Sequence, residues 1–167
     1  EASPVYGLTT IGTLIRWDST APGIITSIGP TGLGANGLIG IDFRPATGEL
    51  YGVSSGNGIF IIDQNTGAAT QVSTLNQGLV GSSFGVDFNP VPDRLRLVSD
   101  QDQNLRVNVA TGVAMVDGAL AFAAGDPNFG VNPFVVAAGY TNSVAGAATT
   151  TLYVLDSNLN ALLIQNP

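Results

Sequence analysis

The chain has 167 residues, enough for one sizeable domain, and 44% of them are apolar whereas only 10% are charged. Five arginines, no lysine and twelve acidic residues give a net charge of −7, which argues against nucleic acid and acidic membrane surfaces as partners. The chain has no histidine and no cysteine, so Ser-His-Asp and Cys-His catalysis, zinc-finger sites and disulfides are excluded. The absence of lysine excludes a Schiff base and a Walker A phosphate loop.

In chain order, residues 5–9 and 13–18 predict two short strands, and the Gly-rich residues 29–40 predict a loop. The next unit is the best defined. It predicts four strands separated by turns rich in Gly, Asn and Thr, over residues 38–43, 49–54, 58–63 and 68–75. Alternation of apolar and polar residues is weak in these strands, which indicates burial on both faces of the sheet.

The same pattern recurs at an offset of 45 residues. IDFRP at 41–45 corresponds to VDFNP at 86–90, and YGL at 6–8 corresponds to YGV at 51–53. A repeat of roughly 40–45 residues that forms four antiparallel strands is typical of a β-propeller blade. Because stacked blades bury both faces of each sheet, this fold also accounts for a high apolar fraction without helices.

The last part of the chain is less regular. Residues 117–125 predict the only short helical turn, and a final unit is predicted from strands over 113–116, 134–142, 149–156 and 161–165. The repeat units fall at about 1–22, 23–67, 68–112 and 113–167, and the two opening strands would be the third and fourth of a blade. We therefore expect one all-β domain of four-stranded antiparallel blades, a β-propeller or partial β-propeller.

The predicted blades number about three and a half, whereas known propellers have about 4–8. We expect either that the natural chain continues beyond Pro167 or that another chain completes the sheet. An unpaired strand edge exposes backbone donors and acceptors and invites strand addition.

Several runs in the second half carry a family resemblance. They are VDFNP at 86–90, DRLRLVS at 93–99, QNLRVN at 103–108, AAGYTN at 137–142 and TLY at 151–153. These runs resemble a bacterial secreted family called domain of unknown function 4394. The resemblance implies a propeller-like all-β fold, export from the cell and longer family members, and it brings no catalytic residues. Low charge and many Thr, Asn and Gly also favour a secreted or cell-surface protein.

The sharpest chemical feature is the run from residue 100 to 104. Asp100, Asp102 and Asn104 offer oxygen ligands at alternate positions of a tight loop, as the first half of an EF-hand loop does for Ca²⁺. The glycine and the distal glutamate of that loop are absent. A polar hairpin turn at a blade edge is the alternative interpretation, and no other cofactor is expected.

Other charged residues favour structural roles. Asp42 and Asp87 occupy equivalent places in successive repeats, which favours a turn or inter-blade hydrogen-bond partner over a catalytic acid. Arg94, Arg96 and Arg106 cluster with the acidic residues Asp93, Asp100 and Asp102. An anion site is one interpretation of this cluster, and an Arg–Asp network that braces one blade is favoured over it.

Aromatic residues offer a further interpretation. Trp17, Tyr6, Tyr51 and Tyr153 would suit a platform for stacking sugars, but the equivalence of Tyr6 and Tyr51 in the repeat favours packing.

For function, we expect a non-catalytic extracellular structural or interaction protein, such as a surface-fibre subunit that joins copies of itself through β-strand complementation. The alternative is an extracellular propeller that binds carbohydrate or Ca²⁺, or a fragment of a larger secreted protein. An enzyme is disfavoured because proton transfer at neutral pH would depend on carboxylates or tyrosine alone. We expect self-association or another protein as partner, carbohydrate as a further ligand, and no membrane insertion, since no apolar run approaches the ~20 residues that span a bilayer.

Overall fold

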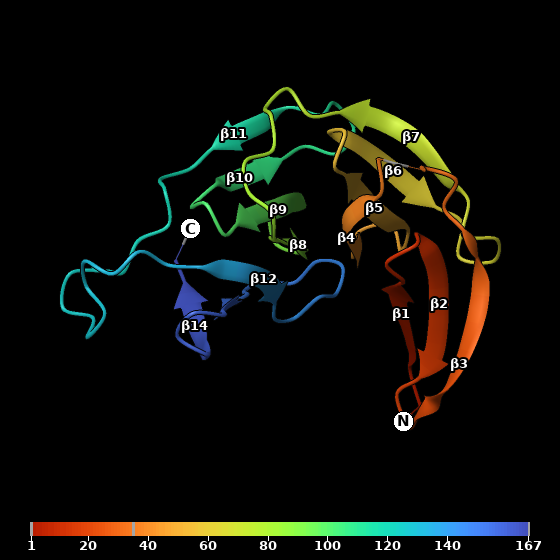
Figure 1. Cartoon of the computed structure of the whole chain (residues 1–167), viewed down its shortest axis with the longest axis horizontal. Helices are drawn as coiled ribbons and strands as arrows, with labels where there is room; N and C mark the ends of the chain where they lie inside the picture. The colour runs from red at the N-terminus through yellow and green to blue at the C-terminus, as the bar shows by residue number, and fades with distance from the viewer. Residues whose placement is uncertain (1, 35, 167) are drawn as a thin grey trace.

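The computed structural model describes residues 2–34 and 36–166, which form four antiparallel sheets and no helix (Figure 1). The first sheet has three strands: β1 (Pro4–Leu8), β2 (Thr13–Asp18) and β3 (Ala21–Pro30). The second has four: β4 (Leu38–Phe43), β5 (Leu50–Ser54), β6 (Gly58–Ile62) and β7 (Ala69–Thr74). The predicted all-β fold and the predicted four-stranded unit are confirmed.

The second half of the chain builds two more sheets. The third contains β8 (Phe84–Asn89), β9 (Arg94–Ser99), β10 (Asn104–Val107) and β11 (Ala114–Val116). The fourth contains β12 (Val135–Tyr140), β13 (Leu152–Asp156) and β14 (Ala161–Gln165). Consecutive strands are paired within every sheet, as expected for hairpin-connected meanders.

The sheets follow one another along an arc, with β4, β8 and β12 on its inner side and β3, β7 and β11 on its outer side (Figure 1). A hydrophobic cluster joins each neighbouring pair of sheets. Leu14 and Leu50 belong to the cluster between the first and second sheets, and Phe88 packs with Tyr51 between the second and third. Val98 and Val154 pack together between the third and fourth.

The inner strands approach closely. A Cβ atom at Gly85 of β8 would lie 2.5 Å from the backbone nitrogen of Ala138 in β12, so only glycine fits at this position. The third and fourth sheets are therefore held backbone to backbone at the inner side of the arc.

Three sequence-based assignments are wrong. Residues 114–116 complete the third sheet as β11 instead of opening the last unit, and residues 117–125 form an irregular segment instead of a helical turn. The opening strands β1 and β2 correspond to β5 and β6, the second and third strands of the full sheet. The Thr9 hydroxyl accepts the Thr13 N–H after β1, as the Ser54 hydroxyl accepts the Gly58 N–H after β5.

Within residues 2–34 and 36–166, no helix is long and apolar enough to cross a bilayer.

Candidate functional site

A buried arginine organises the polar part of the third sheet. Arg96 on β9 is 2% exposed, and its Nη1 donates to Asn104 Oδ1 and to Asp117 Oδ2, both at 2.6 Å. Arg106 on β10 donates to the same Asp117 Oδ2 at 2.8 Å. Burial raises the pKa of Asp117, but the hydrogen bonds from Arg106 and Arg96 outweigh it and hold that pKa below its usual range.

The predicted Arg–Asp network is thus present, but its carboxylate is Asp117. Arg94 lies apart from it and donates to the backbone carbonyls of Pro92 and Asp93. The Asp93 side chain pairs instead with Arg44 of the second sheet. The three arginines of the third sheet therefore do not converge on one anion site.

The structure places the three calcium candidates in different hydrogen-bond environments. Asp100 is buried and accepts from the backbone N–H of Ser82 at 2.9 Å and from its hydroxyl at 2.5 Å. Asn104 Oδ1 accepts from Arg96, so a cation on this oxygen would face a buried guanidinium. Of these three residues, only Asp102 has a buried side-chain oxygen without a hydrogen-bond partner in the described structure. Calcium binding by these three residues stays a prediction.

No group of three or more acidic residues in the described part of the chain is arranged to hold a metal ion.

The repeat-equivalent carboxylates connect the sheets. Asp42 Oδ2 on β4 accepts the backbone N–H of Phe88 on β8, and Asp87 Oδ2 on β8 accepts that of Tyr140 on β12, each at 2.7 Å. In the fourth sheet, Gly139 takes the place that Asp87 has in the third sheet. The series of inter-sheet carboxylates therefore ends at the fourth sheet. The prediction that these aspartates are inter-sheet hydrogen-bond partners is confirmed.

Burial has a marked effect on this carboxylate pair. It raises the pKa of Asp42 to about 6. Burial, followed by the neighbouring charge of Asp42, raises the pKa of Asp87 to about 8. Neither residue lines either of the two cavities described below.

A cavity of about 690 Å³ lies between the irregular segment after β11 and the strand β14. This volume falls within the range of roughly 300–1,000 Å³ that is usual for small-molecule sites. Apolar side chains form much of its wall: Leu120, Phe122, Val135, Val154 and Leu163.

The polar groups of this cavity come from β10, β14 and the irregular segment after β11. Gln165 Nε2 donates to Asn104 Oδ1 at 3.2 Å, and the Gln165 Oε1 atom is buried without a partner in the described structure. Asp117 and Asp126 supply carboxylates, and no lining residue is cationic. Sequence reasoning missed Asp117 and Gln165, because neither belongs to a recognisable motif and tertiary contacts alone bring them to Asn104.

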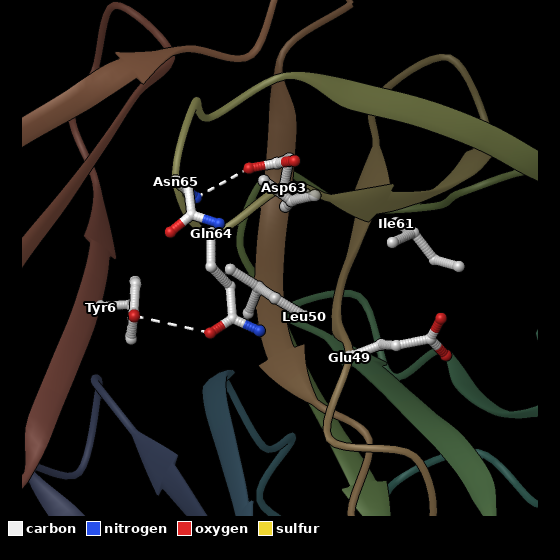
Figure 2. A pocket seen from close by; sticks show the side chains of 8 residues that line it. Tyr6, Glu49, Leu50, Ile61, Asp63, Gln64 and Asn65 are labelled. Carbon is white, nitrogen blue, oxygen red and sulfur yellow. Dashed lines mark hydrogen bonds between the residues drawn. The ribbon is translucent and has the colours of Figure 1, made fainter.

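A smaller cavity of about 300 Å³ lies where the first sheet meets the second (Figure 2). The Tyr6 hydroxyl is 3.5 Å from Gln64 Oε1 across it, and Asp63 accepts the backbone N–H of Asn65 at its rim. Glu49 also contributes to its lining. Its walls are more polar and its volume smaller than those of the cavity beside β14.

The predicted aromatic platform is divided between separate places. Tyr6 packs edge-on against Phe43, and Tyr51 packs in the same way against Phe88, with ring centroids 5.3 and 5.4 Å apart. This confirms packing between sheets for the two repeat-equivalent tyrosines. Trp17 lies in the first sheet and Tyr153 in the fourth, at the two ends of the arc (Figure 1).

Residues 13–167 match the family described as Domain of unknown function (DUF4394), and the chain belongs to this family. No curated protein matches it. One similar solved structure is a structural genomics protein of unknown function from Bacteroides thetaiotaomicron, with 18% identity, a TM-score of 0.60 and coverage of 97% of this chain. Another, with 16% identity, a TM-score of 0.56 and the same coverage, is an auxiliary nutrient binding protein from that organism. The chain spans only 40% and 44% of the lengths of these two proteins, and the likeness concerns the fold alone.

Proposed function

We propose that this member of the DUF4394 family is a non-catalytic extracellular structural or interaction protein. Its sheets are the blades of a β-propeller, and its copies assemble through the two terminal sheets, with β-strand complementation as the means. The observation that carries the proposal is the difference in strand number: the terminal sheets have three strands each, whereas the two inner sheets have four.

The propeller assignment rests on three features of the arrangement. Each sheet is an antiparallel meander, successive sheets pack face to face, and the innermost strands β4, β8 and β12 are neighbours in space. Blades of a propeller have the same relations to one another and to the central axis.

The proposed assembly rests on strand positions that are filled in the two inner sheets and that no described strand fills in the two terminal sheets. No described strand lies beside β1 where β4 lies beside β5, and none lies beside β14 where β7 lies beside β6. Strand edges of this kind offer rows of backbone donors and acceptors to another chain.

The non-catalytic assignment rests on chemistry. The chain has no histidine, cysteine or lysine, and its most perturbed carboxylates, Asp42 and Asp87, accept hydrogen bonds from backbone groups away from both cavities. The low content of charged residues favours an extracellular location.

Sedimentation equilibrium of the chain at increasing concentration tests the assembly. We expect the weight-average mass to rise from 17.0 kDa toward multiples of that value. Amide hydrogen exchange should show new protection in β1 and β14 on association, because strand addition engages their backbone N–H groups. A mass that stays at 17.0 kDa at all concentrations contradicts the proposal.

The cavity beside β14 favours a second candidate function, binding of a neutral hydroxylated ligand such as a carbohydrate. Its apolar wall and the free acceptor Gln165 Oε1 suit a ligand with an apolar ring face and donor hydroxyls. The name of one solved relative, an auxiliary nutrient binding protein, is consistent with this candidate.

A glycan array tests the second candidate. Binding that is lost in Gln165→Leu and retained in Gln101→Leu, a change at an exposed turn outside the cavity, supports it. An array without any bound glycan contradicts carbohydrate as the ligand.

A further inference from the structure

The chain contains two Asn-Gly dipeptides, and the fold places them in different surroundings. Asn36-Gly37 lies in the loop that leads from β3 to β4, and Asn57-Gly58 lies in the turn between β5 and β6. In such a dipeptide the glycine nitrogen can attack the side-chain amide carbon of the asparagine to form a cyclic imide, because glycine has no side chain to hinder the approach. In a folded protein the reaction also requires that these two groups are free to move together.

The dipeptide Asn57-Gly58 is held on both sides of the reacting atoms. The Gly58 N–H donates to the buried Ser54 hydroxyl at 3.1 Å, so this nitrogen is engaged. The Asn57 Oδ1 atom accepts the Leu79 N–H at 3.2 Å, and the Asn57 carbonyl accepts the Leu75 N–H at 2.8 Å. Imide formation at Asn57 therefore requires the turn to open first.

The dipeptide Asn36-Gly37 has the same chemistry without these restraints. Asn36 is exposed, and among the described residues no hydrogen bond engages its side-chain amide or the Gly37 N–H. The Asn36 side chain rests on Gly56, where a Cβ atom would lie 3.2 Å from Asn36 Cγ. The Gly37 carbonyl accepts the Ser55 N–H at 3.0 Å, which anchors the start of β4 and leaves the Gly37 nitrogen free.

We propose that Asn36 is a site of spontaneous deamidation in the folded protein and that Asn57 is not. The Gly37 nitrogen bonds to Asn36 Cγ, the Cγ–Nδ2 bond breaks, and the amide nitrogen leaves as ammonia with the proton from the Gly37 nitrogen. Water then hydrolyses one of the two carbonyl groups of the imide. One product has aspartate at this position and the other has isoaspartate, in which the main chain runs through the former side-chain carbon.

The modification changes the connection between the first and second sheets. Both products add a negative charge to a chain whose net charge is already −7. Isoaspartate also lengthens the main chain directly before β4, the inner strand that carries Asp42. The inference is independent of the proposed function, because it concerns two groups within one loop of a single chain.

Peptide mapping after incubation of the folded protein in mildly alkaline buffer tests the proposal. Cleavage before aspartate gives the peptides 18–41 and 42–62, in which Asn36 and Asn57 are the only side-chain amides. The rise in mass that accompanies exchange of an amide for a carboxyl group should accumulate in peptide 18–41 at least about tenfold faster than in peptide 42–62, because Asn57 reacts only when its turn opens. A new cleavage before residue 36 identifies the aspartate product, since isoaspartate resists this protease.

Gly37→Ala is the matched variant. A Cβ atom at Gly37 would have only the Gly34 carbonyl oxygen nearby, at 4.0 Å, so alanine fits the loop. Its methyl group hinders the attacking nitrogen and should slow the rise in mass of peptide 18–41 by about tenfold or more, without an effect on peptide 42–62. The wild-type chain unfolded in guanidinium chloride is the second control, and there both peptides should gain mass at similar rates.

Three results would overturn the proposal. If peptide 18–41 keeps its mass in the folded protein but gains mass in the unfolded chain, the fold protects Asn36. Equal rates for the two peptides in the folded protein would show that the hydrogen bonds around Asn57 give no protection. An unchanged rate in Gly37→Ala would show that the Gly37 nitrogen is not the attacking group.

Discussion

The two inner sheets and the two terminal sheets are built from the same repeat, yet they differ in what surrounds them. Strands β5 and β9 are buried almost throughout, whereas β14 leaves alternate apolar side chains exposed. β14 lies at the edge of its sheet, whereas β5 and β9 lie inside sheets that have a neighbouring sheet on each side, so strand position and neighbouring sheets together account for the difference in burial. Comparable residues should therefore contribute very differently to stability in the two regions.

The largest difference in the free energy of unfolding is expected between a buried leucine and an exposed leucine. Leu97→Ala at the centre of β9 should lower the free energy of unfolding by about 2–5 kcal/mol, because it leaves a cavity in a fully buried site. Leu162→Ala on β14 should change it by less than about 0.5 kcal/mol in the monomer, since that side chain is exposed. Urea unfolding at low protein concentration measures both, and equal losses would contradict the comparison.

A smaller contrast is expected for the two arginines that share Asp117. Arg96→Met should cost about 2–3 kcal/mol, because the buried acceptor Asn104 Oδ1 loses a charged donor. Arg106→Met is the control, and it should cost less than about 1 kcal/mol because this arginine is partly exposed. Urea unfolding of the two variants side by side gives the difference, and a larger loss for the control would refute a central role for Arg96.

The inter-sheet carboxylates predict a dependence of stability on pH. Because the folded pKa of Asp87 lies near 8, well above the ordinary 3.8, the folded state holds this proton more tightly than the unfolded state. Its contribution to the free energy of unfolding therefore falls as pH rises from about 4 to about 8, the reverse of an aspartate with a lowered pKa.

Asp87→Asn should remove the whole of this fall and leave only the separate fall that Asp42 causes between about pH 4 and its own pKa of about 6. The asparagine oxygen can still accept the Tyr140 N–H, so at pH 8 the variant should be more stable than the wild type by about 1–3 kcal/mol. Thermal unfolding as a function of pH measures this. Parallel curves for the two proteins would show that burial does not perturb Asp87.

The smallest difference in stability concerns the hydroxyls at the C-terminal ends of the equivalent strands β1 and β5. Ser54→Ala in the second sheet should cost about 1 kcal/mol, since its hydroxyl accepts the Gly58 N–H in a buried site. Removing only the hydroxyl by Thr9→Val in the first sheet should cost less, because the same kind of bond is partly exposed there. Equal losses of stability in urea unfolding would show that burial of the turn does not strengthen the contribution of this hydrogen bond.

Local sequence patterns predicted most of the strands and much of their grouping, but they missed β3. The 45-residue offset aligned Asp42 with Asp87 and Tyr6 with Tyr51, and both pairs have the predicted roles between sheets. The offset also aligned β1 with β5, but the count of blades assigned β1 to the wrong place within its sheet. A repeat constrains equivalent residues more strongly than it constrains the position at which a sheet begins.

The site residues were harder to predict. The alternation of Asp100, Asp102 and Asn104 is a local pattern, but their hydrogen-bond partners Ser82, Arg96 and Gln165 come from other strands and loops. The irregular segment after β11 is rich in alanine, so its composition favoured a helical turn, yet it serves as one wall of a cavity. Partners that meet only through folding leave no periodic signal in the chain.

The sequence by itself determined that this protein is an all-β repeat of short antiparallel strands, because turn residues and strand-forming runs act over a few neighbouring positions. Only the tertiary structure decided which carboxylate joins Arg96 and Arg106, and which residues line the cavity beside β14. Those features depend on which sheets pack side by side, and packing brings together residues that are far apart in the chain.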